Sequence, residues 1–211
     1  ARKAEDQFVA DGHARGRFDV LYNDFVVVGP AADPAKVAGL AAASAAFAAI
    51  GRAKAPFLSR GDRSGTHVKE MAVWDGLKMA PAGNAWYRQV GQGMGDTLVA
   101  ANEQRAYTLS DRATWLAMAS KLPELRLLLG GARPSENPDR ALRNHYGVMA
   151  VSPDRHPSVN HALAARFVEW LISVEAQRAI GEFGVAQHGQ PLYYPDSDEF
   201  KATQAHGEGR R

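Results

Sequence analysis

The chain of 211 residues has no cysteine, which excludes a disulfide, a thiolate nucleophile and a cysteine-based zinc site. It has no apolar run of about 18 residues, so the sequence predicts no transmembrane helix. The 25 basic and 23 acidic side chains nearly balance, and the basic ones are scattered, which argues against a nucleic-acid-binding face. The start lacks the pattern of a signal peptide, and residues 4–10 predict a helix. We therefore expect the chain to begin within a fold.

The motifs of common enzymes are also missing. The chain has no G-x-S-x-G, no P-loop lysine motif and no H-E-x-x-H, and its seven histidines are dispersed. The glycines at 91, 93 and 95 do not have the spacing of a dinucleotide-binding turn. We therefore expect no catalytic residues and no metal site.

Three segments repeat the order of a short strand, a polar turn and a helix. The turns lie at residues 59–66, 91–97 and 110–112. This repetition is typical of a parallel α/β layer, in which ligands bind at the carboxyl ends of the strands, where helix N-termini meet. The sequence therefore predicts that the three turns share one site for an anion or another polar ligand.

The first turn carries the residue types that an oxyanion site requires. Ser59, Ser64 and Thr66 supply hydroxyl donors, and Arg60 or Arg63 supplies a forked positive charge. The following helix, in which Val68, Met71, Ala72 and Trp74 are expected to share a face, offers unpaired backbone N–H groups at its start. An ordinary capped helix on a polar turn would have the same pattern. The residues alone leave both interpretations open.

The remaining segments predict a two-lobed, hinged protein. Residues 18–30 predict a long buried strand and residues 35–54 an alanine-rich helix. Asn160 is expected to cap an amphipathic helix with one apolar side, formed by Leu163, Phe167, Leu171 and Ile172. The segments 18–30 and 144–153 bracket the three units and are candidates for crossing between lobes. The predicted parts are a first lobe of residues 1–29 and 146–195, a second lobe of residues 30–145, and a polar tail of residues 196–211.

Six segments, in this order, are similar to the periplasmic tungstate-binding proteins of bacterial tungstate ABC importers. They are Tyr22 to Pro30, Ser59 to Asp62 with Ser64 to His67, Gly91 to Gly95, Tyr107 to Arg112, Phe183 to Val185, and Gly189 to Leu192. The resemblance covers about residues 1–195. It implies an α/β fold of the type II periplasmic-binding-protein class, with two three-layer lobes that hold a tetrahedral oxyanion between them. It further implies tungstate as the ligand, with molybdate as the alternative, no cofactor, a membrane permease as partner and a periplasmic location.

The resemblance also assigns roles to residues. Ser59 and Arg60 would donate directly to the oxyanion, and Ser64, Gly65 and Thr66 would form a cradle at the helix N-terminus. Contributions are also expected from the neighbouring loop. Its candidate residues are Gly93, Met94 and Gly95. Four further residues would shape the cleft, or serve only as caps and ion-pair partners: Asp62, Ser110, Asp111 and Arg112.

One departure from the family affects the first lobe. The family begins with a strand and a Thr/Ser-rich turn that supplies hydroxyl ligands, and this chain has no such segment. We therefore expect a first lobe that is incomplete at its N-terminus, with self-association through that lobe as one consequence.

Two other functions stay open. One is a degenerate binding-protein fold that acts as an interaction or assembly protein without binding an oxyanion. The other is a phosphotransferase-like enzyme that uses the same anion cradle, although the sequence places no metal-binding carboxylate pair and no general base.

Overall fold

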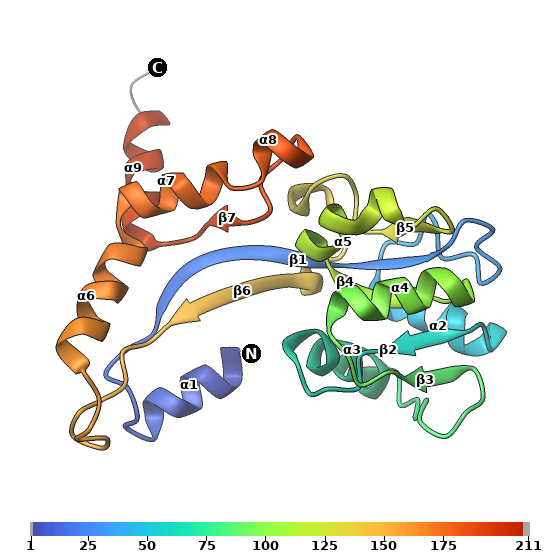
Figure 1. Cartoon of the computed structure of the whole chain (residues 1–211), viewed down its shortest axis with the longest axis horizontal. Helices are drawn as coiled ribbons and strands as arrows, with labels where there is room; N and C mark the ends of the chain where they lie inside the picture. Colours follow the sequence, from blue (N-terminus) through green and yellow to red (C-terminus); the bar gives the residue numbers. More distant parts are fainter. Residues whose placement is uncertain (1, 209–211) are drawn as a thin grey trace. The chain divides into compact units, whose positions relative to one another are not determined.

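The computed structural model describes residues 2–208, and the chain divides into two compact units (Figure 1). One unit comprises residues 24–143, and the other combines the residues up to 23 with those from 144 onward. The division therefore falls inside strand β1 (Phe18–Pro30) and at the start of strand β6 (Arg143–Val148). The lobe boundaries expected from the sequence, 29/30 and 145/146, lie a few residues further along the chain. No helix among the described residues is long and apolar enough to span a membrane.

The sheet of the 24–143 unit contains the predicted parallel layer. Strand β2 (Phe57–Ser59) pairs in parallel with β3 (Tyr87–Gln89). A parallel bridge joins Phe57 to Tyr107, directly before β4 (Thr108–Asp111). On its other side β4 pairs antiparallel with β1, which in turn pairs antiparallel with β5 (Leu125–Leu129). The prediction that the three strand–turn–helix units run in parallel is confirmed.

Helices cover both faces of this sheet. Val27 and Phe57 point to the core that contains Phe47 of α2 (Ala43–Ala53) and Trp74 of α3 (Gly65–Gly76). The adjacent residues Val26 and Leu58 point to the opposite core, which α4 (Met94–Gln104) and α5 (Arg112–Met118) cover. Successive residues of a strand face opposite sides of the sheet, so one strand supplies both cores. The predicted three-layer α/β architecture is confirmed in this unit.

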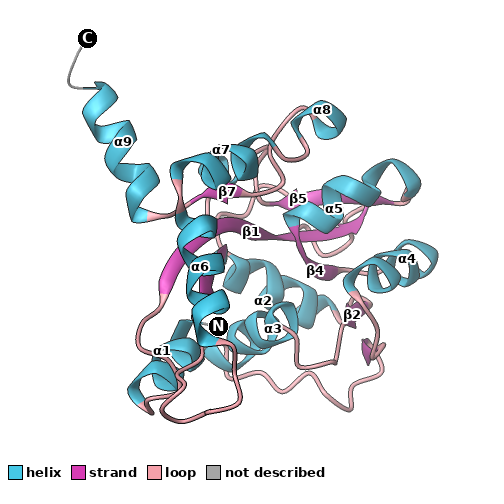
Figure 2. Ribbon diagram, turned by 60° about the vertical axis from the view of Figure 1, so that its left-hand side comes forward, coloured by secondary structure: helices cyan, strands magenta, loops and turns pink. Residues whose placement is uncertain are grey.

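The other unit is built on the first part of β1. This part of β1 pairs with β6 and with β7 (Tyr194–Pro195). Figure 2 shows its helices in cyan; they are α1 (Arg2–Ala10), α6 (His161–Ile172), α7 (Val174–Glu182), α8 (Val185–His188) and α9 (Asp198–Glu208). The polar segment after β7 is attached to the unit, because Ser197 is fully buried and its Oγ donates to the Ile172 carbonyl at 2.8 Å.

The predicted helix at residues 35–54 begins late. Helix α2 starts only at Ala43, and turns occupy the preceding residues. The Asp33 carboxylate accepts hydrogen bonds from the backbone N–H groups of Val37 at 3.0 Å and Ala38 at 2.8 Å. A side chain that captures nearby amides in this way competes with helix formation. The alanine-rich composition alone therefore gave the wrong start.

The apolar side predicted for the helix after Asn160 is wrong in part. The Asn160 side chain caps α6 as predicted, accepting from the Leu163 N–H at 3.1 Å. Leu163 and Phe167, however, are 60% and 53% exposed, whereas Val168 and Ile172 are buried. The helix is apolar on two sides, and the periodicity alone could not show which side packs against α7 and α9.

Candidate functional site

The first two polar turns lie side by side at the carboxyl ends of β2 and β3. The N–H of Val90 donates to the Ser59 carbonyl at 2.9 Å, and the N–H of Gly91 donates to the Arg60 carbonyl at 2.8 Å. These bonds continue the parallel pairing past the ends of the strands and fix the backbone from which Arg60 extends. The predicted convergence of these two turns at one edge of the sheet is therefore present.

The turn leads into α3 through a tight polar network. Ser64 is the N-cap, and its Oγ accepts from the His67 N–H at 3.3 Å. Asp62 accepts the Ser64 N–H at 3.1 Å and the Arg60 Nη2 at 2.5 Å. Burial alone would raise the pKa of Asp62, but the hydrogen bonds from Ser64 and the Arg60 guanidinium lower it to about 2. Asp62 is therefore an anion at neutral pH and holds one side of the Arg60 guanidinium.

Four donors in this segment have no acceptor among the described residues. Two are the backbone N–H groups of Gly65 and Thr66, which lie between capped neighbours in the first turn of α3. The others are the buried Arg60 Nε and the buried Nε2 of His67. The His67 Nδ1 accepts the Arg63 N–H at 3.0 Å, so the proton of a neutral ring lies on Nε2. Free N–H groups are ordinary at the start of a helix, but buried side-chain donors normally have partners, so the two orphaned nitrogens of Arg60 and His67 are unusual. Together the four donors fit an oxygen-rich anion.

Ser59 lies deeper than the other candidates. It is fully buried, and its Oγ accepts the Gly61 N–H at 3.2 Å. Its hydroxyl lies close enough to the Glu70 carboxyl to lower the pKa of that group by hydrogen bonding. Glu70 is one of three buried residues on the inner side of α3, with Thr66 and Trp74. The expected face of α3 was wrong at Val68, which is 48% exposed, and at Ala72, which is also exposed.

Glu70 is a buried polar residue that the sequence did not single out. The side chain is 2% exposed, and its Oε1 accepts the Tyr87 hydroxyl at 2.7 Å and the Trp74 Nε1 at 3.3 Å. Burial raises the pKa of Glu70, although hydrogen bonds from Ser59 and Tyr87 act in the opposite direction. A glutamate in a helix commonly faces solvent. The four-residue spacing of Thr66, Glu70 and Trp74 was the available signal for this buried side.

The second turn contributes backbone rather than side chains. Gly93 is the N-cap of α4 and has no side chain to cap it. Met94 is 5% exposed and packs in the core beside Leu58, so its side chain points away from the turn. A Cβ on Gly95 would lie 3.2 Å from the Met118 Sδ, which explains the small residue there. This helix start therefore offers N–H groups beside the first turn.

The third turn is occupied by structural contacts. The Ser110 Oγ donates to the Asp111 carbonyl at 2.9 Å, and Asp111 caps α5 by accepting the Thr114 N–H at 2.9 Å. Arg112 is 1% exposed and forms a two-pronged pair with Asp24 at 2.6 and 2.7 Å. It also donates to two backbone carbonyls, those of Gly130 and Gly131. The cap and ion-pair interpretation of these residues therefore describes their observed contacts.

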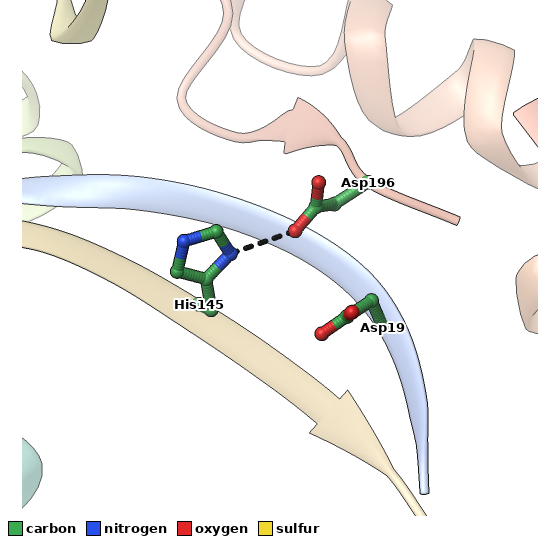
Figure 3. Close-up of side chains that lie close together, drawn as sticks. All are labelled: Asp19, His145 and Asp196. Carbon is green, nitrogen blue, oxygen red and sulfur yellow. Dashed lines mark hydrogen bonds and ion pairs between the residues drawn. The ribbon is translucent and has the colours of Figure 1, made fainter. Parts of the chain in front are cut away.

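One cluster in the other unit has metal-ligand chemistry. Ligand atoms of Asp19, His145 and Asp196 lie within 4.8 Å of one another (Figure 3). The His145 Nδ1 lies 2.7 Å from Asp196 Oδ2, and the Lys201 Nζ lies 2.9 Å from Asp196 Oδ1. Asp19 is paired with Arg17. Since basic side chains already neutralise both carboxylates, a cation would have to compete with them, and we assign no metal to this cluster.

Comparisons with known proteins identify the family of the chain. A protein-family model, that of the PBP superfamily domain, matches residues 1–175. A proposed ABC transporter anion-binding protein from Haloferax volcanii is 45% identical over 197 residues, which are 93% of this chain and 56% of that protein. Tungstate-binding protein TupA from Peptoclostridium acidaminophilum is 41% identical over 199 residues, which are 93% of this chain and 66% of that protein. The chain thus spans less than two thirds of the length of these two relatives.

A solved structure extends the comparison to the fold. The tungstate-binding protein TupA from Desulfovibrio alaskensis G20 is 40% identical, with a TM-score of 0.77. The match covers 94% of this chain and 77% of that one. The family model, the sequence identities and the shared fold agree, and the chain belongs to the PBP superfamily, with tungstate-binding proteins among its relatives.

Proposed function

We propose that this chain is the solute-binding component of an ABC importer and captures a tetrahedral oxyanion, with tungstate as the favoured ligand. The observation that carries the proposal is the set of unpartnered donors at the start of α3. Arg60 Nε, His67 Nε2 and the N–H groups of Gly65 and Thr66 lie within eight consecutive residues. Such donors match the oxygens of a dianion, whereas a cation or an apolar ligand would leave them unpaired.

The donors act together with fixed charge. The positive end of the α3 dipole and the Arg60 guanidinium favour a negative ligand, and Asp62 orients that guanidinium. A buried donor left without a partner costs about 1–3 kcal/mol. An oxyanion whose bonds are too short to reach every donor would therefore bind less tightly. Discrimination by size follows from the rigid attachment of this turn to β3.

The choice of tungstate comes from the relatives. Two of them carry the name tungstate-binding protein, and a third is named for anion binding in an ABC transporter. Molybdate is the alternative ligand. From the same relatives we propose a periplasmic location, a membrane permease as partner, and no catalytic activity or cofactor. The position of the oxyanion between two lobes rests on the resemblance alone.

A ligand panel tests the proposal. The midpoint of thermal unfolding is measured for the purified chain alone and with tungstate, molybdate, sulfate or phosphate. A ligand at a hundred times its dissociation constant stabilises the folded state by about 2.7 kcal/mol, which raises the midpoint by several degrees. We expect tungstate to give the largest rise, molybdate a smaller one, and sulfate and phosphate little. Equal rises for all four anions would contradict a selective cradle.

One observation favours the alternative of an assembly protein without a ligand. Leu163, Phe167 and Trp170 form an exposed apolar stripe on α6, each more than half exposed. Such stripes are common at interfaces between chains. A concentration-dependent mass in analytical ultracentrifugation, lost in Phe167→Glu, together with no response to any oxyanion, would favour this alternative.

A further inference from the structure

A second buried network lies directly behind the proposed cradle. Its members are Ser59 at the end of β2, Glu70 on the inner side of α3, and Tyr87 at the start of β3. Their exposed fractions are 0%, 2% and 6%. The network therefore belongs to the rigid core, but through Ser59 it reaches the turn that carries Arg60.

Glu70 has hydroxyl and indole partners but no cationic one. Among the described residues no lysine or arginine pairs with its carboxyl. Tyr87 and Trp74 both donate to Oε1, which leaves Oε2 as the oxygen that can carry a proton. An ionised carboxyl in this position is expensive, since a buried charge without a paired cation is poorly solvated. A dianion bound at the start of the same helix adds like-charge repulsion.

The proton on this carboxyl decides what the Ser59 hydroxyl can do. When Glu70 is ionised, the Ser59 O–H donates to the carboxylate. When Glu70 is protonated, its own O–H donates to Ser59 Oγ, which also accepts the Gly61 N–H. The Ser59 hydroxyl proton is then released from Glu70. A serine hydroxyl has one proton to donate and two lone pairs to accept, so both arrangements satisfy it.

We propose that Glu70 is a positioning residue for the oxyanion: by holding a proton and donating it to Ser59 Oγ, it releases the Ser59 hydroxyl to donate to the bound dianion. This role of Glu70 rests on the proposed function, because it concerns the same oxyanion-binding site. Binding of the dianion then takes up a proton, and at pH values where free Glu70 is ionised the dissociation constant rises with pH. Burial raises the pKa of Glu70, which brings this range closer to neutral pH.

The contribution of Glu70 to the pH dependence has to be distinguished from that of other titratable groups nearby. His67 of α3 and Tyr87 of β3 act on its carboxyl directly. Of the elements packed on α3, helix α2 has Arg52 as its charged side chain, which is exposed, and β4 has Asp111, which is occupied as the cap of α5. His67 is therefore the neighbour whose contribution has to be tested separately, because it lies on the same helix and acts on the Glu70 carboxyl.

The test is calorimetric titration of the chain with sodium tungstate in two buffers of different ionisation enthalpy, at several pH values. For the wild type we expect uptake of up to one proton per tungstate, with the dissociation constant rising by up to about tenfold per pH unit. Glu70→Gln keeps the hydrogen-bonding shape but cannot titrate, and we expect it to bind without proton uptake. Asp75→Asn, which removes an exposed carboxyl at the far end of α3, should behave as the wild type.

The outcomes separate the two proposals. Tungstate binding by the wild type without proton uptake would overturn the role of Glu70 and leave the proposed function intact. Proton uptake that persists in Glu70→Gln would assign the proton to His67, and this result would also overturn the role of Glu70. No binding of tungstate by the folded wild type would instead remove the proposed function itself. If Glu70→Gln does not fold, proton uptake is measured in His67→Gln instead. Uptake that persists in this variant would support Glu70 as the group that takes up the proton, and its loss would overturn that role.

Discussion

The backbone N–H of Arg63 donates to the His67 Nδ1 at 3.0 Å. Because Nδ1 accepts this hydrogen bond, Nε2 is the nitrogen that carries the proton of the neutral ring. Arg63 adopts a left-handed backbone conformation, with φ of +62°, at the residue before the N-cap of α3. A non-glycine residue in this region costs about 1–3 kcal/mol and is held by its surroundings. The turn thus fixes the imidazole as a donor at the start of the helix.

Removal of the imidazole should weaken oxyanion binding while the fold is retained. We expect His67→Ala to raise the dissociation constant for tungstate by about tenfold to a hundredfold, because a hydrogen bond to a charged group contributes about 1.5–3 kcal/mol. His67→Gln, which can place an N–H near the position of Nε2, should recover part of the affinity. Calorimetric titration measures both variants. Wild-type affinity in His67→Ala would show that Nε2 does not contact the ligand.

The turn should tolerate a methyl group at one glycine and not at another. Gly61 has φ of +64°, and an added Cβ would lie 2.7 Å from the Gln89 Cβ. We expect Gly61→Ala to destabilise the fold by about 1–3 kcal/mol and to weaken tungstate binding, since the clash displaces Arg60. Gly65→Ala is the control for stability, because an added Cβ there meets nothing within 4 Å. Equal midpoints in urea for both variants would contradict the assigned strain.

Loss of the Arg112 guanidinium should unfold the chain more readily. Arg112→Ala leaves the buried Asp24 carboxylate without its cation, and such a loss typically costs about 3–5 kcal/mol. Urea unfolding followed by tryptophan fluorescence measures the change. The matched control is Arg105→Ala, which removes an ion pair to Glu124 whose side chains are 71% and 45% exposed. We expect the control to stay within experimental error, and an Arg112→Ala variant of equal stability would contradict the structural role of the pair.

The raised pKa of Glu70 gives stability a definite pH dependence. The native state holds this proton more tightly than the unfolded chain, in which the ordinary value is 4.5. The contribution is therefore complete at pH values below 4.5 and is lost as the pH rises through the folded pKa. The free energy of unfolding of the wild type, minus that of Glu70→Gln, should fall over this range. A difference that stays flat or increases with pH would show that Glu70 is not held protonated.

Local patterns predicted the elements that form the site. The strand at residues 18–30 and the three strand–turn–helix units follow from β-branched runs, glycine-rich turns and apolar helix periodicity, all of which are local. Their parallel order also follows, because each strand is succeeded by its own helix. The pairing of Asp24 with Arg112 was not predicted, because 88 residues separate them and local patterns do not show which distant residues meet.

The errors share a physical cause. Helix propensity favoured a helix from residue 35, but the Asp33 side chain binds the amides that the helix would have used. The sequence did not predict the burial of Glu70, because an ionisable residue in a helix is expected at the surface. Hydrogen bonds with Tyr87, Trp74 and Ser59 make its burial tolerable. In both cases hydrogen bonds made by specific side chains override the average preference of the residue type.

The donor set at α3 is the central claim, and calorimetric titration of the chain with tungstate tests it most directly, with Arg60→Ala measured beside the wild type. We predict that the wild type binds tungstate tightly, and that Arg60→Ala shows no detectable binding while its circular dichroism spectrum is unchanged. A folded wild type that takes up no tungstate, or an Arg60→Ala variant that binds with wild-type affinity, would contradict it.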